Sequence, residues 1–215
     1  FSVTTSYLGF LFDLLGPPFL PTYNDMQFKY KIRPDSKNEI TFIGIGAIDQ
    51  FELNTGIQDP DESQRYILGY LPVNEQWNYT FGIVYKHFRK NGFDRWVISR
   101  NYLDNRAYKY LNNIETDSLK TFDYVSSEAE NRARYEHVSR LNNYRITYGA
   151  GINYARYTNE TFQRIFSDSL SVVDYTSSLD VFNWSVFSQV SRKFLAERLT
   201  LSLGLRMDAN NYSDE

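Results

Sequence analysis

The feature that most constrains this sequence is an alternation of apolar and polar residues with a period of two. Between Trp77 and Tyr85 every second residue is aromatic or aliphatic, and most of the positions between them are polar or glycine. The same alternation runs through residues 144–154 and 199–207. Successive side chains of a β-strand point to opposite faces, so the pattern predicts strands with one apolar and one polar face.

These segments reach about ten residues or more, whereas strands of soluble proteins usually have about 5–6. Their length matches the roughly 9–11 tilted residues with which a strand crosses a bilayer. In a soluble sandwich the apolar face would be the core. In an outer-membrane barrel it would face lipid, and the polar face would line the lumen. Alternation alone is compatible with both arrangements.

The links between the segments differ in length and favour the barrel. Short polar links are expected at 34–38, 90–94, 141–143 and 195–197, and long irregular links at 54–76, 112–130 and 161–179. Short turns on one side and long loops on the other are typical of outer-membrane barrels. We therefore predict an all-β, antiparallel, up-and-down transmembrane β-barrel segment that is open at both edges. Its roughly nine long strands are expected at residues 2–12, 26–33, 39–51, 76–88, 95–108, 131–140, 144–156, 181–194 and 198–208.

The composition of the chain argues against several classes of protein. The net charge is −3 and the Lys and Arg residues are scattered, which argues against a nucleic-acid partner. The chain has no cysteine, so disulfides and thiolate metal sites are excluded. No apolar run approaches the roughly 20 residues of a membrane-spanning helix. The mean hydropathy of −0.50 is still compatible with a barrel, because only alternate residues need to face lipid.

Several stretches resemble the barrel of TonB-dependent outer-membrane receptors of the Bacteroidetes type. They are Gly16–Lys31 and Asn38–Asp49, which form an expected hairpin, together with Tyr148–Tyr154 and Leu199–Asp208. The resemblance implies a parent barrel of about 22 strands with a plugged lumen. We expect residues 1–215 to be part of the C-terminal barrel domain of such a receptor. The plug domain, the TonB-contacting segment and the remaining strands would belong to other parts of a longer chain.

The function implied by the resemblance is TonB-dependent active uptake of a nutrient, such as a glycan or a siderophore, across the cell outer membrane. The implied partners are outer-membrane lipid, TonB, the protein's own plug domain and, for a glycan importer, a surface lipoprotein. Two alternatives remain open. One is a passive outer-membrane porin or adhesin barrel. The other is a secreted carbohydrate-binding β-sandwich, which predicts that Trp77, Phe81, Tyr148 and Leu203 lie in a core between two sheets.

No catalytic or cofactor-binding constellation stands out, and we predict that the protein is not an enzyme. His87 and His137 are the two imidazoles, and no ligand residues have the spacing of a metal site around them. The acidic residues 59–62 lack the EF-hand ligand pattern and are interpreted as a solvated loop. No metal site or cofactor is therefore expected.

The alternation also assigns individual side chains to the two faces. The residues expected to face lipid are Tyr79, Phe81, Ile83, Ile152, Leu201 and Leu203. Those expected to face the lumen include Lys29, Lys86, Arg145 and Arg206. Aromatic residues near the short turns (Tyr30, Trp96, Tyr144, Phe194) and near the long loops (Trp77, Tyr157, Phe182, Trp184) would form two membrane-interface belts. Substrate contacts are expected from loop aromatics, namely Tyr66, Tyr70, Tyr124 and Tyr175.

Overall fold

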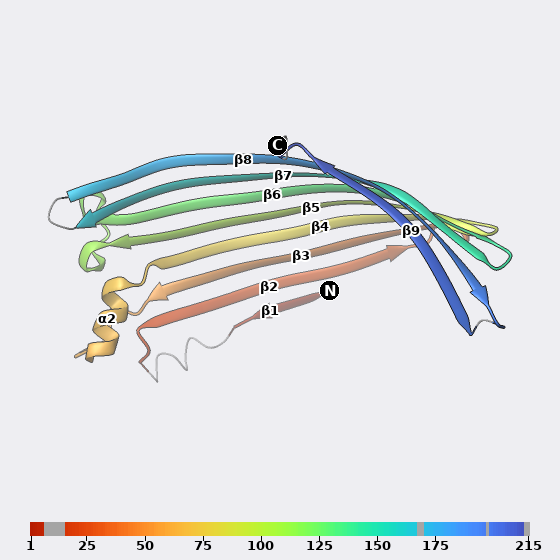
Figure 1. Cartoon of the computed structure of the whole chain (residues 1–215). Helices are drawn as coiled ribbons and strands as arrows, with labels where there is room; N and C mark the ends of the chain where they lie inside the picture. Colours follow the sequence, from red (N-terminus) through yellow and green to blue (C-terminus); the bar gives the residue numbers. More distant parts are fainter. Residues whose placement is uncertain (7–15, 167–169, 197, 213–215) are drawn as a thin grey trace.

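The computed structural model describes residues 1–6, 16–166, 170–196 and 198–212, which form one curved antiparallel sheet of nine strands (Figure 1). The strands follow one another across the sheet in sequence order, so each pairs only with its neighbours in the chain. They are β1 (Ser2–Thr5), β2 (Phe19–Ile32), β3 (Asn38–Leu53), β4 (Val73–Arg89), β5 (Gly92–Tyr110), β6 (Lys120–Leu141), β7 (Tyr144–Phe166), β8 (Leu170–Phe194) and β9 (Leu199–Asn210).

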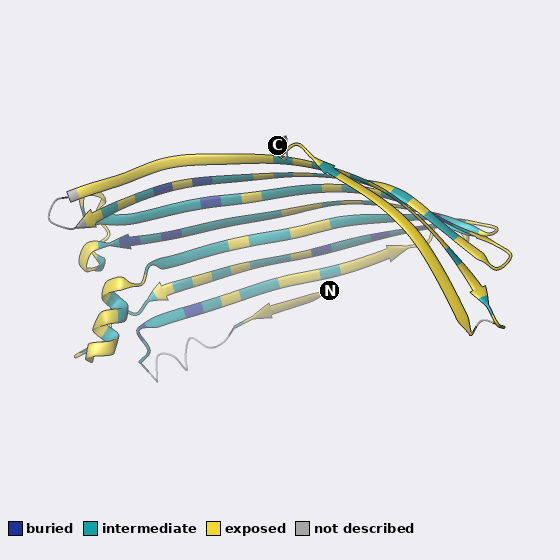
Figure 2. Cartoon of the chain, viewed as in Figure 1, coloured by how far each residue is buried: buried dark blue, intermediate teal, exposed yellow. Residues whose placement is uncertain are grey.

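The sheet is a single layer within the described residues, and β1 and β9 are its open edges. Very few side chains are buried (Figure 2); the buried hydrophobic residues are Ala107 and Val138. Leu203, which a sandwich would place in its core, is 78% exposed. The predicted open, antiparallel, up-and-down sheet is thus confirmed, and the alternative of two packed sheets is not supported.

The connections lie at two different ends of the sheet. Short turns join β2 to β3, β4 to β5, β6 to β7 and β8 to β9; we call this the short-turn end, on the right in Figure 1. The opposite, long-loop end carries helix α2 (Glu62–Tyr70) between β3 and β4, and the short 3-10 helices η1 (Leu111–Asn113) and η2 (Asp117–Leu119) between β5 and β6. The described residues contain no helix that is long and apolar enough to cross a membrane.

Two of the three predicted long loops are mostly strand. Residues 120–130 belong to β6, and residues 161–166 and 170–179 belong to β7 and β8, which have 23 and 25 residues. These segments are rich in Ser, Thr and acidic residues and lose the alternation of the spanning segments. Backbone pairing nevertheless continues through them, from Phe122↔Gln163 to Phe166↔Leu170. Only the loop 54–72 has the expected length, and residues 7–12 of the first predicted strand lie outside the described residues.

Interstrand register arranges the side chains in rows that cross the sheet on one face or the other. One such row consists of Ile83, Ile98, Ala133, Ile152 and Trp184. The next position along each strand belongs to the other face, because successive side chains alternate. We call the face of this row the apolar face. The polar face carries the row Gly82, Ser99, Arg132, Asn153 and Asn183.

Gly149 marks a close approach between strands. A Cβ atom at this position would lie 2.3 Å from the carbonyl oxygen of Tyr135 and 2.7 Å from the ring of Phe187. At Gly82 the nearest atom to an added Cβ would be the Cβ of Ser99, at 3.5 Å, which is an ordinary contact. The position in β7 therefore requires glycine, and the position in β4 does not.

We expect Gly149→Ala to lower the free energy of unfolding by about 1–3 kcal/mol, because the added methyl group overpacks the sheet. The matched substitution Gly82→Ala should leave the stability unchanged or raise it slightly, since alanine restricts the unfolded chain. Urea unfolding of the protein refolded in detergent micelles measures both. Equal losses in the two variants would contradict the assignment of a close approach to Gly149.

Candidate functional site

The candidate site is the sheet itself, with its two faces. On the apolar face, rows of aliphatic and of aromatic side chains follow one another along the strands. The middle row is the aliphatic one that contains Ile83 and Ile152. Aromatic rows lie on both sides of it. Tyr85, Trp96 and Tyr135 share a row toward the short-turn end. Tyr79 and Tyr102 share a row toward the long-loop end, with their rings 5.7 Å apart.

Three tyrosine hydroxyl groups of the apolar face point away from the aliphatic middle. Toward the short-turn end, Tyr85 donates to Asn38 Oδ1 at 2.7 Å and Tyr135 donates to Asp94 Oδ1 at 2.8 Å. Toward the long-loop end, Tyr154 donates to Asp180 Oδ1 at 2.6 Å. Tyrosines with an apolar ring on one side and a wet hydroxyl group on the other are typical of membrane interfaces.

On the middle strands of the sheet, two polar rows bound the apolar band. One contains Asn38, His87, Asp94 and His137, and the other contains Asp104, Ser127, Thr158 and Ser178. Along β5 the two rows are ten residues apart, from Asp94 to Asp104. Ten residues extend about 34 Å along a strand, which a tilt of about 45° reduces to about 24 Å. The lipid-facing band of outer-membrane barrels is about 25 Å tall.

Asp94 anchors the polar row at the short-turn end. Its carboxylate is fully buried and accepts hydrogen bonds from Arg89 Nε at 2.5 Å and from the hydroxyl group of Tyr135, and it lies 2.6 Å from His137 Nδ1. The ring of His137 packs on Tyr148, with centroids 4.9 Å apart. The sequence analysis missed this cluster. Asp94 and His137 are 43 residues apart, and only the pairing of β5 with β6 brings them together.

The polar face is basic in its short-turn half. Glu39 is 4% exposed and contacts both Lys31 Nζ, at 3.2 Å, and Arg33. Arg95 Nη2 donates to both carboxylate oxygens of Glu136, at 2.8 Å each, and Arg134 donates a further hydrogen bond at 3.0 Å. Each acid is therefore shared by two cations. Further cations on this half include Lys29, Lys86, Arg140, Arg145 and Arg206.

The long-loop half of the polar face is instead rich in tyrosine, amide and hydroxyl groups. Tyr124 and Tyr157 have their hydroxyl oxygens 3.2 Å apart, and Asn159 Nδ2 donates to Tyr157 at 3.1 Å. Thr161 donates to Asn159 Oδ1 at 2.7 Å and lies in one row with Tyr124 and Tyr175. This cluster of five residues, which we call the tyrosine cluster, presents ring faces and hydrogen-bonding groups together.

The register distributes the individually assigned residues as follows. Lys29, Lys86, Arg145 and Arg206 share the polar face, and Tyr79, Phe81, Ile83, Ile152, Leu201 and Leu203 share the apolar face. Tyr66 and Tyr70 lie on α2, with ring centroids 4.7 Å apart. The loop location expected for Tyr124 and Tyr175 is wrong, because both belong to strands, β6 and β8.

One member of the expected long-loop belt is misplaced. Tyr157 lies on the polar face, opposite Glu128. The sequence pattern indicates that the strand ends near residue 156, whereas β7 continues to Phe166, and its alternation carries Tyr157 to the other side. Trp184, another member of the expected belt, is on the apolar face, in the row of Ile152.

The loop that carries α2 is tied to the sheet by one buried lysine. Lys109 is 8% exposed, and its Nζ donates to the carbonyl oxygen of Leu68, in the last turn of α2, and to Asn113 Oδ1. Burial lowers the pKa of Lys109 to about 8. A lysine released from this site would titrate near its usual, higher pKa, so docking of the loop becomes more favourable as the pH rises between the two values.

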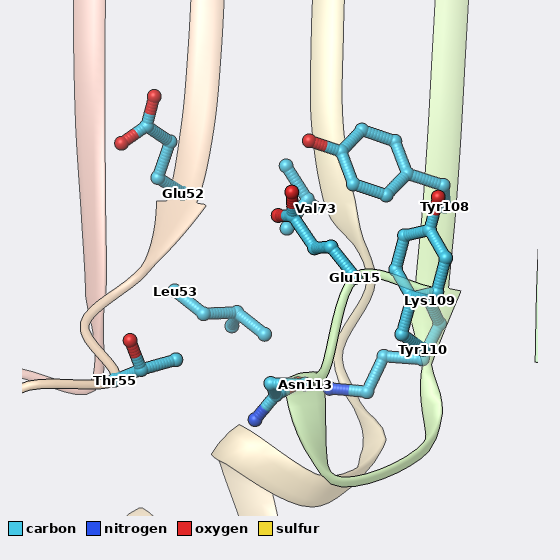
Figure 3. A pocket seen from close by; sticks show the side chains of 9 residues that line it. All are labelled: Glu52, Leu53, Thr55, Val73, Tyr108, Lys109, Tyr110, Asn113 and Glu115. Carbon is cyan, nitrogen blue, oxygen red and sulfur yellow. Dashed lines mark hydrogen bonds between the residues drawn. The ribbon is translucent and has the colours of Figure 1, made fainter. Parts of the chain in front are cut away.

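A cavity of about 290 Å³ lies beside this anchor. Figure 3 shows Glu52 and Leu53 of β3 on one side of it and Tyr108, Lys109 and Tyr110 of β5 on the other. The cavity arises because β3 and β4 stop pairing at Phe51↔Asn74, whereas β4 and β5 pair as far as Val73↔Tyr108. It is therefore an open gap at the rim of the sheet, lined also by Thr55 of the β3–β4 loop and by Asn113 and Glu115 of the β5–β6 loop.

We expect Lys109→Met to loosen the α2 loop, because the carbonyl group of Leu68 loses its charged donor. Loss of a hydrogen bond to a charged group corresponds to about a tenfold rise in local opening. Limited trypsin digestion, monitored by the rate of cleavage after Arg65 in α2, measures this opening. Lys120→Met is the matched control, since the Lys120 amine bonds to Asp123 and not to the helix. An unchanged rate in Lys109→Met would show that the lysine does not anchor the loop.

No protein-family model and no curated protein matches the sequence. Solved structures do match. The copper transporter OprC is 13% identical with a TM-score of 0.64, and the match covers 89% of this chain and 29% of that one. The ferric enterobactin receptor PfeA from Pseudomonas aeruginosa is 13% identical with a TM-score of 0.62, over 91% of this chain and 30% of that one. The outer membrane transporter YddB from Escherichia coli is 9% identical with a TM-score of 0.55, over 90% and 28%.

These likenesses establish the fold. The chain spans about 30% of the length of the structures it matches, and its sheet corresponds to part of their β-barrels. The fold class predicted from the alternation, a segment of a barrel wall, is thereby confirmed.

Proposed function

We propose that this chain forms part of the wall of an outer-membrane β-barrel that takes up a nutrient under the control of TonB. The apolar face would contact lipid, and the polar face would line the lumen. The observation that carries the proposal is the spacing of the two polar rows. On β5 they bound an apolar band with the height of a membrane core, and the hydroxyl groups of Tyr85, Tyr135 and Tyr154 point out of it.

Lipid offers no hydrogen bonds to an open strand edge, so a sheet that spans a membrane must close on itself. The free edges of β1 and β9 therefore call for further strands, and the matched structures are long enough to contain them. A plug domain inside the barrel, contact with TonB and membership of the Bacteroidetes type belong to the same proposal. A surface lipoprotein partner would follow if the nutrient is a glycan.

The tyrosine cluster is proposed to contact the nutrient at the mouth of the lumen, together with Tyr66 and Tyr70 of α2. Rings beside hydroxyl and amide groups suit a large polar solute with hydrogen-bonding groups, such as a glycan or a siderophore. The basic short-turn half of the polar face would then lie deeper in the lumen. Uptake, not catalysis, is the proposed activity.

The experiment follows uptake of radiolabelled glycans and ferric siderophores by cells that produce the full-length protein. We expect the protein in the outer-membrane fraction and accumulation of one solute that stops when TonB is deleted. Tyr124→Ala combined with Tyr175→Ala should weaken binding of that solute about tenfold, as expected for the loss of two aromatic contacts. Tyr30→Ala, on the apolar face near the short turns, is the matched control and should bind normally.

Two outcomes would contradict the proposal. A protein recovered from the periplasm or the medium would exclude a barrel wall. Accumulation that continues without TonB would replace active uptake by a passive pore. If uptake depends on TonB but the tyrosine double variant binds normally, the barrel remains and the binding site must be sought elsewhere on the polar face.

A further inference from the structure

Arg100 is an unusual residue on the apolar face. Between the two polar rows, the described part of this face carries two cations, Arg100 and Arg156. The Nε of Arg100 donates to the hydroxyl group of Tyr79 at 2.9 Å, and its Nη1 donates to Asn131 Oδ1 at 2.8 Å. Its guanidinium group also lies 6.0 Å from the ring centre of Tyr102. Among the described residues no acid lies within ion-pair distance of it.

The other charged residues near Arg100 on this face are Arg156 and two acids. Arg156 lies one row nearer the long-loop end, in the row of Tyr79 and Tyr102, and its Nε is 3.9 Å from Asp180. Asp104, one row farther on, is 3.4 Å from the hydroxyl group of Tyr102. Asp180 offsets the charge of Arg156, so within the described ranges Arg100 is the cation of this band that lacks a counter-charge. A charge within the lipid-facing band is costly unless something pairs with it.

An apolar groove begins at Arg100 and runs toward the short-turn end. Its first part lies between Phe81, Ile83 and Ile98 on one side and Ile152, Tyr154 and Phe182 on the other. Its second part continues past Ile98 and Ile152 to Trp96 and Tyr135. Small side chains form the floor, with Ala133 common to both parts and Ala150 in the second. From the row of Arg100 to the row of Trp96 the groove extends four residues, about 14 Å along the strand.

We propose that this groove binds one membrane lipid with an anionic phosphate headgroup. The acyl chain would lie over Ala133, between Ile98 and Ile152, and the phosphate would pair with Arg100. The direction is fixed by the structure, because the cation lies at the end of the groove nearer the tyrosines of the long-loop border. This assignment rests on the proposed function, since it requires the apolar face to contact lipid.

Neighbouring side chains hold the guanidinium group of Arg100 in position to bind the phosphate. Tyr79 and Asn131 fix the guanidinium group through Nε and Nη1, while no hydrogen bond engages Nη2 among the described residues. Guanidinium groups pair with phosphate oxygens through several donors at once, so a group already held in place loses little conformational freedom on binding. Alanine on the floor leaves the depth that a larger side chain would fill.

Native mass spectrometry of the full-length protein in detergent tests the proposal, with phosphatidylglycerol as the anionic probe and phosphatidylcholine as the comparison. We expect one tightly retained phosphatidylglycerol molecule. Arg100→Gln should weaken its retention about tenfold, the loss expected for a charge-assisted hydrogen bond. Ala133→Leu should displace both lipids, because it fills the groove. Arg206→Gln, an arginine on the polar face, should retain the lipid as the unsubstituted protein does.

Strand content from circular dichroism establishes that each variant is folded. Inorganic phosphate should not compete with the lipid, because it lacks the acyl chain; competition would identify a phosphate site instead of a lipid site. Normal retention in Arg100→Gln, or equal losses in Arg100→Gln and Arg206→Gln, would overturn the proposal. These results can occur in a protein that is inserted in the outer membrane and active in uptake, so they separate the lipid site from the proposed function.

Discussion

The ladder of backbone hydrogen bonds between neighbouring strands is the interaction on which the rest of this structure depends. In the part of the chain that the structure describes, it connects β1 through to β9 and contains one shift of register, near the end of β5. Among the described residues, the buried hydrophobic side chains are Ala107 and Val138, so a hydrophobic core does not hold the strands together. In lipid, where backbone groups have no other partner, such a ladder is strong, and it fixes which side chains share a face.

The two faces follow from this register. Because side chains alternate, a slip of one residue in any strand would place its charged side chains among the apolar ones. The shared carboxylates of Glu39 and Glu136 on the polar face, and the hydroxyl groups of Tyr85 and Tyr135 on the apolar face, each bridge neighbouring strands. These cross-strand contacts exist only in the observed register and therefore help to specify it.

The sequence predicts the fold well where one face is apolar. In residues 77–85, 144–154 and 199–207, alternation alone gives both the strand and the face of each side chain, because contact with a uniform apolar medium demands a strict pattern. It fails beyond the apolar band. There both faces are polar, the alternation disappears, and the extensions of β6, β7 and β8 look like loops. Tyr124, Tyr157 and Tyr175 were misassigned for this reason. The cluster around Asp94 needed the pairing of β5 with β6, which no local pattern contains.

The central claim is that the apolar face contacts the acyl chains of a bilayer, and the three tryptophans report on it directly. All lie on this face: Trp96 near the short-turn border, Trp184 in the middle row and Trp77 in the row of Asp104. The measurement is fluorescence quenching of single-tryptophan variants, with the other two replaced by Phe, in vesicles of lipids brominated at different depths. The account predicts that brominated lipids quench all three tryptophans. A Trp184 insensitive to every brominated lipid but quenched by aqueous acrylamide would contradict it.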